Sequence, residues 1–162
     1  MSADLNKLQQ LILRIGNNPY VQNLGQTKLW KLIYFADVAA LREYGRTITG
    51  SEFIRYDHGP VPSRGEKCLK VLSRAGALTI TQVDHGTHRL NRVVQACDAD
   101  DDAFSAEERH IIDHVCRHLG RKTAVALSDL SHQEPAWRYA GRLAKLEPEL
   151  MLYGASEDPE GL

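Results

Sequence analysis

Residues 27–45 read TKLWKLIYFADVAALREYG, and this stretch decides the fold. Thr27 is placed to cap the start of a helix, and Gly45 to end it in a left-handed conformation after about Tyr44. At about 100° per residue, one broad face of this helix is apolar and carries Leu29, Leu32, Ile33, Ala36, Ala39 and Ala40. A second apolar stripe, nearly opposite, carries Trp30, Tyr34, Val38 and Leu41. A helix that is apolar almost all round is either buried on both sides or keeps one side for a partner.

The composition is that of one globular domain. The chain has 162 residues, of which 43% are hydrophobic and 25% charged. Its net charge of −1 provides no overall positive field for holding nucleic acid. No run approaches the roughly 18 apolar residues of a membrane span, and the start lacks a secretory signal, so we expect a cytoplasmic protein without a membrane partner. The three cysteines, Cys68, Cys97 and Cys116, are widely spaced, which favours reduced thiols.

The remaining pattern predicts a mainly helical α+β domain over residues 1–153, followed by a frayed acidic tail at 154–162. Ser63 with Glu66, and Ser105 with Glu108, have the spacing of capping boxes at helix starts. The expected helices span 5–15, 27–44, 63–75, 105–119, 123–130 and 135 to about 153. The expected β element is a short strand at 52–56, closed by a turn at 58–62, and a hairpin of strands 78–83 and 88–94 around a turn at 84–87.

The helix at 63–75 carries Lys67, Lys70 and Arg74 opposite its apolar face, and the hairpin follows it. This is the order of a winged-helix DNA-binding protein, in which the helix enters the major groove. A solvated basic face is the simpler explanation, since the overall charge does not support DNA binding. DNA-binding regulation is therefore the alternative function.

The helix at 105–119 carries His110, His114 and His118 at i, i+4 and i+8, a spacing that can recruit Zn²⁺. His110 points away from the core and His118 lies at its edge, so a metal site needs ligands from elsewhere; we expect a solvated face and no cofactor. Signatures of nucleophilic or phosphate chemistry, such as GxSxG, a P-loop or HExxH, do not occur. An enzyme is therefore not expected.

Four blocks together resemble one known family. They are KLWKLIYFAD at 28–37, YGRTITG at 44–50, GPVP at 59–62, and LSDLSHQE at 127–134 with Trp137. The chain resembles the Panacea domain of the SocA-like antitoxin family over about residues 5–145. The resemblance implies a helix-rich, noncatalytic antitoxin that binds a cognate protein toxin directly and suppresses its activity.

The resemblance gives the motif residues structural roles. Gly45, Gly50, Gly59 and Pro60 are expected to set backbone geometry. Asp37, Arg46 and Thr49 are expected to form a buried polar link between the long helix and the turn after it. His132 and Trp137 are expected to lock the C-terminal helices together, with direct binding to a partner as the alternative.

A toxin-binding surface is expected to combine aromatic anchors with basic neighbours. The residues that fit best are Trp30, Lys31, Tyr34, Leu41 and Arg42. Trp30 is a departure, because this position is often polar in the family. Contact of this stripe with a partner competes with its burial against the first or last helix.

Overall fold

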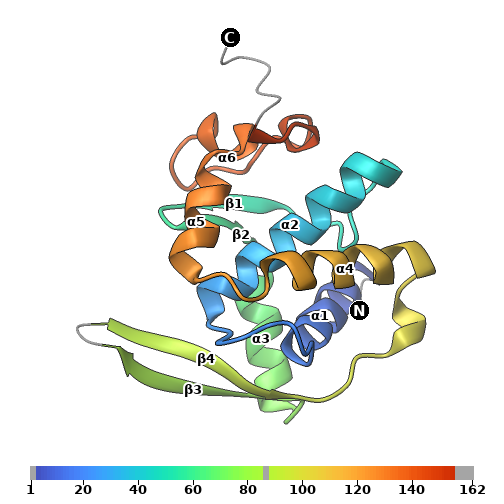
Figure 1. Cartoon of the computed structure of the whole chain (residues 1–162), viewed down its shortest axis with the longest axis vertical. Coiled ribbons are helices and arrows are strands. Elements are labelled where there is room, and N and C mark those ends of the chain that lie inside the picture. The colour runs from blue at the N-terminus through green and yellow to red at the C-terminus, as the bar shows by residue number, and fades with distance from the viewer. Residues whose placement is uncertain (1–2, 86–87, 156–162) are drawn as a thin grey trace.

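Helix α2 (Gln26–Tyr44) runs through the centre of the molecule, and α1, α4, α5, β2, β4 and the short 3-10 helix η2 pack around it (Figure 1). The structure, a computed structural model, describes residues 3–85 and 88–155. The other elements are α1 (Ala3–Gly16), β1 (Phe53–Tyr56), β2 (Gly59–Pro62), α3 (Gly65–Arg74), β3 (Leu78–His85), β4 (His88–Ala96), η1 (Asp101–Ala103), α4 (Ala106–Leu119), α5 (Ala124–His132), α6 (Pro135–Arg138) and η2 (Leu150–Leu152). The expected α+β class with a small β component is confirmed.

Helix α2 is buried on both of its apolar sides. Leu29, Leu32 and Ile33 on the broad face are fully buried, and Tyr34 and Val38 on the second stripe are 0% and 1% exposed. The helix starts after Gly25, which makes no side-chain cap, so the expected cap at Thr27 is wrong. It ends as expected at Gly45, whose φ of 83° allows its N–H to bond the Leu41 carbonyl.

Strands β1 and β2 form an antiparallel pair in which Phe53 lies opposite Pro62 and Arg55 opposite Pro60. The turn expected at 58–62 is thus largely a strand. Proline is tolerated there because Arg55 and Phe53 direct their backbone groups to the other side of β1, where they bond Leu143, Ala144 and Leu146. The missing N–H groups of both prolines therefore cost no ladder bond.

The β3–β4 hairpin is longer than expected and projects from the helical body (Figure 1). The hairpin is attached to the loop before α2 through β4. The Val93 N–H donates to the Leu24 carbonyl at 2.8 Å, and Arg92 and Gly25 form an isolated antiparallel β-bridge. The predicted turn at 84–87 includes residues 86–87, which lie outside the described residues, as do residues 156–162 of the predicted tail.

Two predicted capping boxes have different outcomes. Ser105 and Glu108 form the box at the start of α4. Ser63 does not cap α3, which begins at Gly65 after Arg64. The backbone N–H of Ser63 instead bonds the Glu52 carbonyl at 2.8 Å and continues the β1–β2 ladder.

The helix expected from 135 to about 153 is wrong, because α6 ends at Arg138. The Arg55 guanidinium donates to the carbonyls of Trp137, Arg138 and Ala140 at 3.2, 3.2 and 2.8 Å. These carbonyls are the ones a longer helix needs as acceptors. Leu143, at φ 60°, then turns the chain back along β1.

Asp37 lies in the interior of α2 and organises the turn that follows the helix. Its Oδ1 accepts the N–H groups of Ile48 and Thr49 at 2.9 and 3.0 Å, and its Oδ2 accepts the Thr49 hydroxyl at 2.5 Å. Burial raises the pKa of Asp37 from 3.8 to about 6, although the bonds from Thr49 and Ile48 oppose that shift. The predicted polar link is present between Asp37 and Thr49, but Arg46 is exposed and outside it, because its position beyond Gly45 points to solvent.

Replacing Asp37 tests the cost of this buried carboxyl. Because its folded pKa lies above its unfolded value, its contribution to the free energy of unfolding is full below about pH 4 and is lost as the pH rises to about 6. We expect wild type to lose stability relative to Asp37→Asn over that window, measured by urea denaturation, and the difference to be constant above it. The matched control is Asp129→Asn at an exposed position. A difference that does not vary between pH 4 and 7 contradicts the assignment.

Candidate partner-binding site

The two lysines of the 28–37 motif point into the molecule. Lys28 is 3% exposed, and its Nζ donates to the carbonyls of Gln22 and Gly120. It thereby joins the loop before α2 to the end of α4. Burial lowers the pKa of Lys28, and the two carbonyls replace the water it lost.

Lys31 is 1% exposed and lies under Gly59 of β2. Its Nζ is 3.5 Å from the Thr27 carbonyl, and burial lowers its pKa to about 8. A Cβ on Gly59 would overlap the Lys31 side chain and lie 2.5 Å from Ser131 Oγ. With its φ of 127°, Gly59 is required both for space and for backbone conformation.

The aromatic residues of the predicted partner stripe are also internal. Trp30 is 4% exposed, and its ring lies 2.9 Å from where a Cβ on Gly65 would stand. Tyr34 packs edge to face against Phe53, with ring centroids 5.2 Å apart. Burial of Tyr34 raises the pKa of its hydroxyl, and the nearby buried Glu134 raises it further.

The hypothesis that this stripe is a surface is therefore corrected for three residues. Trp30, Lys31 and Tyr34 are covered by β2, α3, α5 and the C-terminal residues, so a partner does not reach them while the fold is closed. Leu41 is half-buried and packs against the core, and Arg42 is at the surface. Contact with a partner stays a prediction for Leu41 and Arg42.

Arg42 holds the C-terminal residues against the end of α2. Its Nε donates to the Met151 carbonyl at 3.1 Å, and its Nη2 to the Tyr153 carbonyl at 2.8 Å and to Glu134 Oε1 at 2.7 Å. Glu134, 4% exposed, is a buried carboxylate that sequence reasoning missed. Its placement in the LSDLSHQE block was the available signal.

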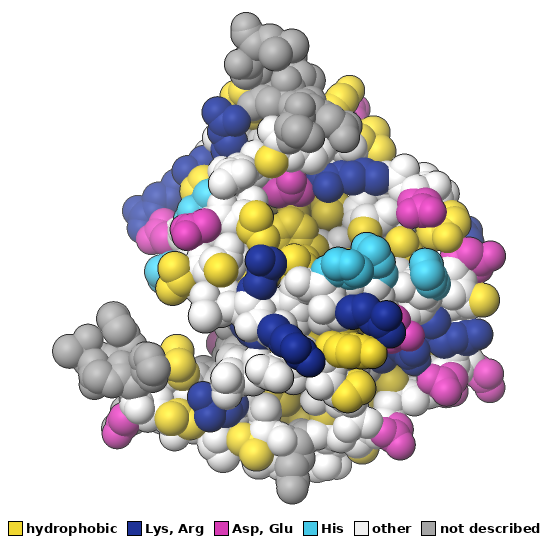
Figure 2. Space-filling model, in the orientation of Figure 1, with side chains coloured by type: hydrophobic (Ala, Val, Ile, Leu, Met, Phe, Trp, Pro, Cys, Tyr) yellow, Lys and Arg dark blue, Asp and Glu magenta, His cyan; other side chains and the backbone are white. Residues whose placement is uncertain are grey.

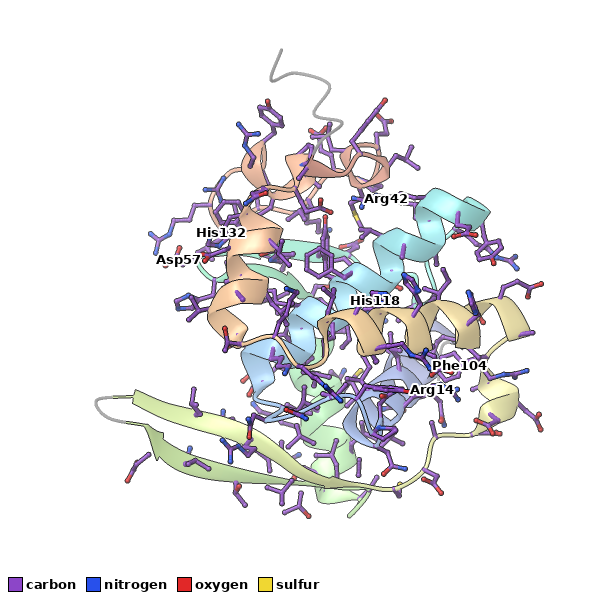
Figure 3. All side chains as sticks on the ribbon, in the orientation of Figure 1. Arg14, Arg42, Asp57, Phe104, His118 and His132 are labelled. Carbon is purple, nitrogen blue, oxygen red and sulfur yellow. The ribbon has the colours of Figure 1, made fainter. Side chains whose placement is uncertain are left out.

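His132 and Trp137 join α5 and α6 to β1. Their rings stack with centroids 4.1 Å apart, Trp137 Nε1 donates to the Tyr56 carbonyl at 3.0 Å, and the Arg55 guanidinium lies 3.9 Å from the Trp137 ring. Figure 3 shows His132 beside Asp57 at the β1–β2 turn. Burial lowers the pKa of His132 there. These contacts agree with the packing role expected from the resemblance.

Two other predicted groups lie on the surface. Lys67, Lys70 and Arg74 are exposed along α3, and Lys70 is 4.0 Å from Glu66. The three histidines of α4 are exposed on the face shown in Figure 2. The rings of His114 and His118 are tilted by 35° with centroids 4.1 Å apart, and His118 Nδ1 is 2.9 Å from the His114 carbonyl. Within residues 3–85 and 88–155, no three metal-binding side chains converge.

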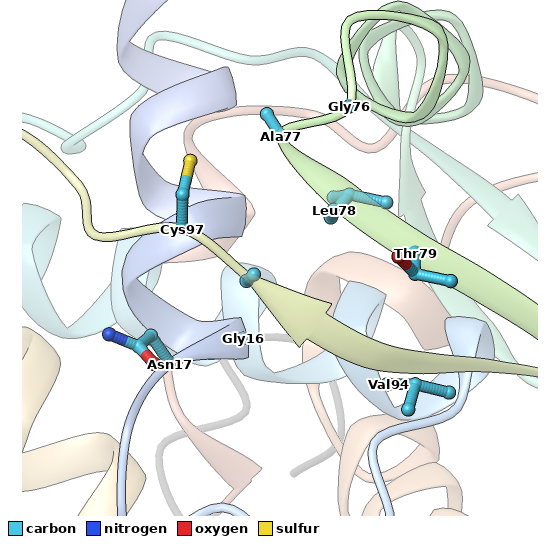
Figure 4. A pocket seen from close by; sticks show the side chains of 9 residues that line it. Gly16, Asn17, Gly76, Ala77, Leu78, Thr79, Val94 and Cys97 are labelled. Atoms are coloured by element: carbon cyan, nitrogen blue, oxygen red, sulfur yellow. The ribbon is translucent and has the colours of Figure 1, made fainter.

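A hollow of about 500 Å³ lies between the end of α1 and the base of the hairpin (Figure 4). It is lined by Gly16, Asn17, Gly76, Ala77, Leu78, Thr79, Val94, Ala96 and Cys97. Cys97 is the one titratable side chain in this lining, so the hollow holds no pair of groups for acid–base or nucleophilic chemistry.

Comparison with known proteins gives a match to a protein family. The model of the family described as antitoxin SocA-like, Panacea domain, matches residues 29–138, which is more than half of the chain. Neither a curated protein nor a solved structure matches. Among the described residues, none of the helices has the length and apolar character needed to cross a membrane.

Gly59 and Gly45 form a matched pair for testing the packing against Lys31. Both have positive φ, but a Cβ on Gly45 meets nothing within 4 Å. We expect Gly45→Ala to cost about 1 kcal/mol of unfolding free energy from backbone strain alone. Gly59→Ala should cost clearly more in chemical denaturation, and equal losses contradict the close contact.

Trp30 tests burial against partner contact. Removal of a buried tryptophan side chain costs about 3–5 kcal/mol. Trp30→Ala should therefore lower the melting temperature strongly in the isolated protein, as followed by circular dichroism. An unchanged melting temperature with loss of partner binding would restore Trp30 as an interface residue.

Proposed function

The chain belongs to the SocA-like antitoxin family with a Panacea domain, and on that premise we propose that it neutralises a cognate protein toxin by binding it directly. The observation that carries the proposal is the family match over residues 29–138, which reaches from α2 to α6. The protein acts in the cytoplasm by forming a complex, without catalysis and without a cofactor.

The interior supports a binding role. Three buried charged groups of the motif blocks join segments of the chain: Lys28 binds two carbonyls, Asp37 holds the turn at 48–49, and Glu134 binds Arg42. Groups that are fully engaged in packing have no position from which to contact a substrate. The blocks therefore build a scaffold, and the surface of that scaffold meets the toxin.

DNA-binding regulation is the second candidate. One support is the order of α3, β3 and β4 along the chain. The other is that Lys67, Lys70 and Arg74 are exposed on α3, as the basic side chains of a DNA-recognition helix must be. The net charge of −1 weighs against it.

The first test is growth of cells that express the adjacent open reading frame with and without this protein. We expect the neighbour to arrest growth, co-expression to relieve the arrest, and the pair to copurify as a stable complex. A variant with Lys67, Lys70 and Arg74 all replaced by alanine should neutralise as well as wild type, since the basic face has no part in the proposal.

Arrest that co-expression does not relieve would contradict the proposal. So would the absence of both toxicity and copurification for either neighbour. Salt-dependent DNA binding that disappears in the triple-alanine variant would then support the regulator.

A further inference from the structure

Residues 140–155, here called the C-terminal strap, follow α6, and residues 143–146 of the strap lie along the free edge of β1. Arg55 N–H donates to the Ala144 carbonyl, Leu143 N–H to the Arg55 carbonyl, and Leu146 N–H to the Phe53 carbonyl, each at 2.9 Å. This is the pattern of an antiparallel neighbour. The strap therefore forms an isolated antiparallel bridge with β1, between Ile54 and Lys145.

The strap is held a second time at the end of α2, where Arg42 donates to the carbonyls of Met151 and Tyr153. Figure 1 shows this part of the chain next to α6, above the end of α2. Both holds use backbone groups of the strap as their acceptors or donors. Any extended protein segment offers the same groups, which is the basis of recognition by strand addition.

The apolar side chains of the strap are partly buried and partly exposed. Leu146 and Met151 are 4% exposed, but Leu143, Leu152 and Tyr153 are 58%, 46% and 37% exposed. Leu143 also adopts a φ of 60°, which is costly for a bulky residue. The strap thus occupies the β1 edge with two buried apolar anchors, Leu146 and Met151, and with local backbone strain at Leu143.

The family match ends at Arg138, the last residue of α6. The β1 edge, Arg42 and Arg55 lie inside the matched region, whereas the strap lies beyond it. We propose that the β1 edge, with Arg42 and Arg55, is the toxin-binding site, and that an extended segment of the toxin replaces the strap there. This inference rests on the proposed antitoxin function and names its binding surface.

The geometry defines the partner segment. It runs antiparallel to β1, places an apolar side chain where Leu146 lies, and presents carbonyl or carboxylate oxygens to Arg42. Arg42 then contacts the toxin, as the sequence pattern predicted. The projecting hairpin also exposes Leu90 and Val94, but within residues 3–85 and 88–155 nothing indicates what these two side chains bind.

A disulfide can hold the strap in place. Ile54 and Lys145 are directly opposite each other, and the bonds of Arg55 to Ala144 and of Leu146 to Phe53 flank them, so they form a pair without mutual hydrogen bonds. Cβ atoms in such pairs are about 4.5–5.5 Å apart, near the range a disulfide spans. The test protein is Ile54→Cys/Lys145→Cys in a Cys97→Ser background, because Cys97 is the exposed thiol of the three.

The oxidised variant should bind and neutralise the toxin at least about tenfold more weakly than the same variant reduced, because the disulfide keeps the strap on the β1 edge. The reduced form is the matched control, having the same side chains. Equal binding in both forms overturns the inference. Failure of the proposed function is distinct, because the unmodified and reduced proteins then bind no toxin either.

Hydrogen exchange of the full chain tests the strap without a partner. The Arg55 amide bonds the strap, whereas the Ile54 amide faces Val61 of β2 and serves as control in the same strand. We expect Arg55, Leu143 and Leu146 amides to exchange at least about tenfold faster than Ile54, through local opening. Oxidation of the cysteine pair should remove the difference for Arg55. Exchange of all these amides at one common rate overturns the inference.

Discussion

The central constraint on this structure is the burial of charge on a helix that is surrounded on all sides. Helix α2 carries Lys28, Lys31 and Asp37 into a region where exposure is 3% or less. A charge without partners in such a region costs several kcal/mol. Neighbouring segments must therefore bring polar groups to defined points along the helix, and this requirement places the loops as firmly as apolar packing places the helices.

Each buried group accounts for a different part of the architecture. Lys28 draws together the loop at Gln22 and the end of α4 at Gly120, two segments far apart in sequence. Asp37 closes the chain into the turn that leads to β1. The Lys31 side chain leaves no room for another side chain above it. Strand β2 therefore crosses α2 with Gly59 at the point of contact. The spacing of the motif blocks in the sequence thus follows from the geometry of α2 and of the segments that pack on it.

Local patterns predicted the elements whose signals are local. The length of α2, its end at Gly45, the capping box of α4 and the hairpin all follow from neighbouring residues, whereas the link from Asp37 to Thr49 was expected from the family resemblance. The errors arose where a distant group competes with local preference. Residues 135–153 have a helical pattern, but Arg55, some 80 positions earlier in the chain, takes the carbonyls that the helix needs. The second stripe of α2 was visible, but periodicity does not say what covers it.

The polar contacts of the molecule differ in the free energy that their loss costs. This difference separates the buried contacts around α2 from the contacts of the C-terminal strap. Asp37 is 0% exposed, so breaking its hydrogen bonds leaves its carboxylate and the N–H groups of Ile48 and Thr49 buried without water to replace the bonds. The Arg42 side chain is 28% exposed, and water can replace the carbonyls of the strap at its guanidinium. The polar contacts of Asp37 are therefore costly to break, whereas the contacts of Arg42 with the strap cost less. A binding edge built this way can exchange its occupant while the helix that positions Arg42 remains folded.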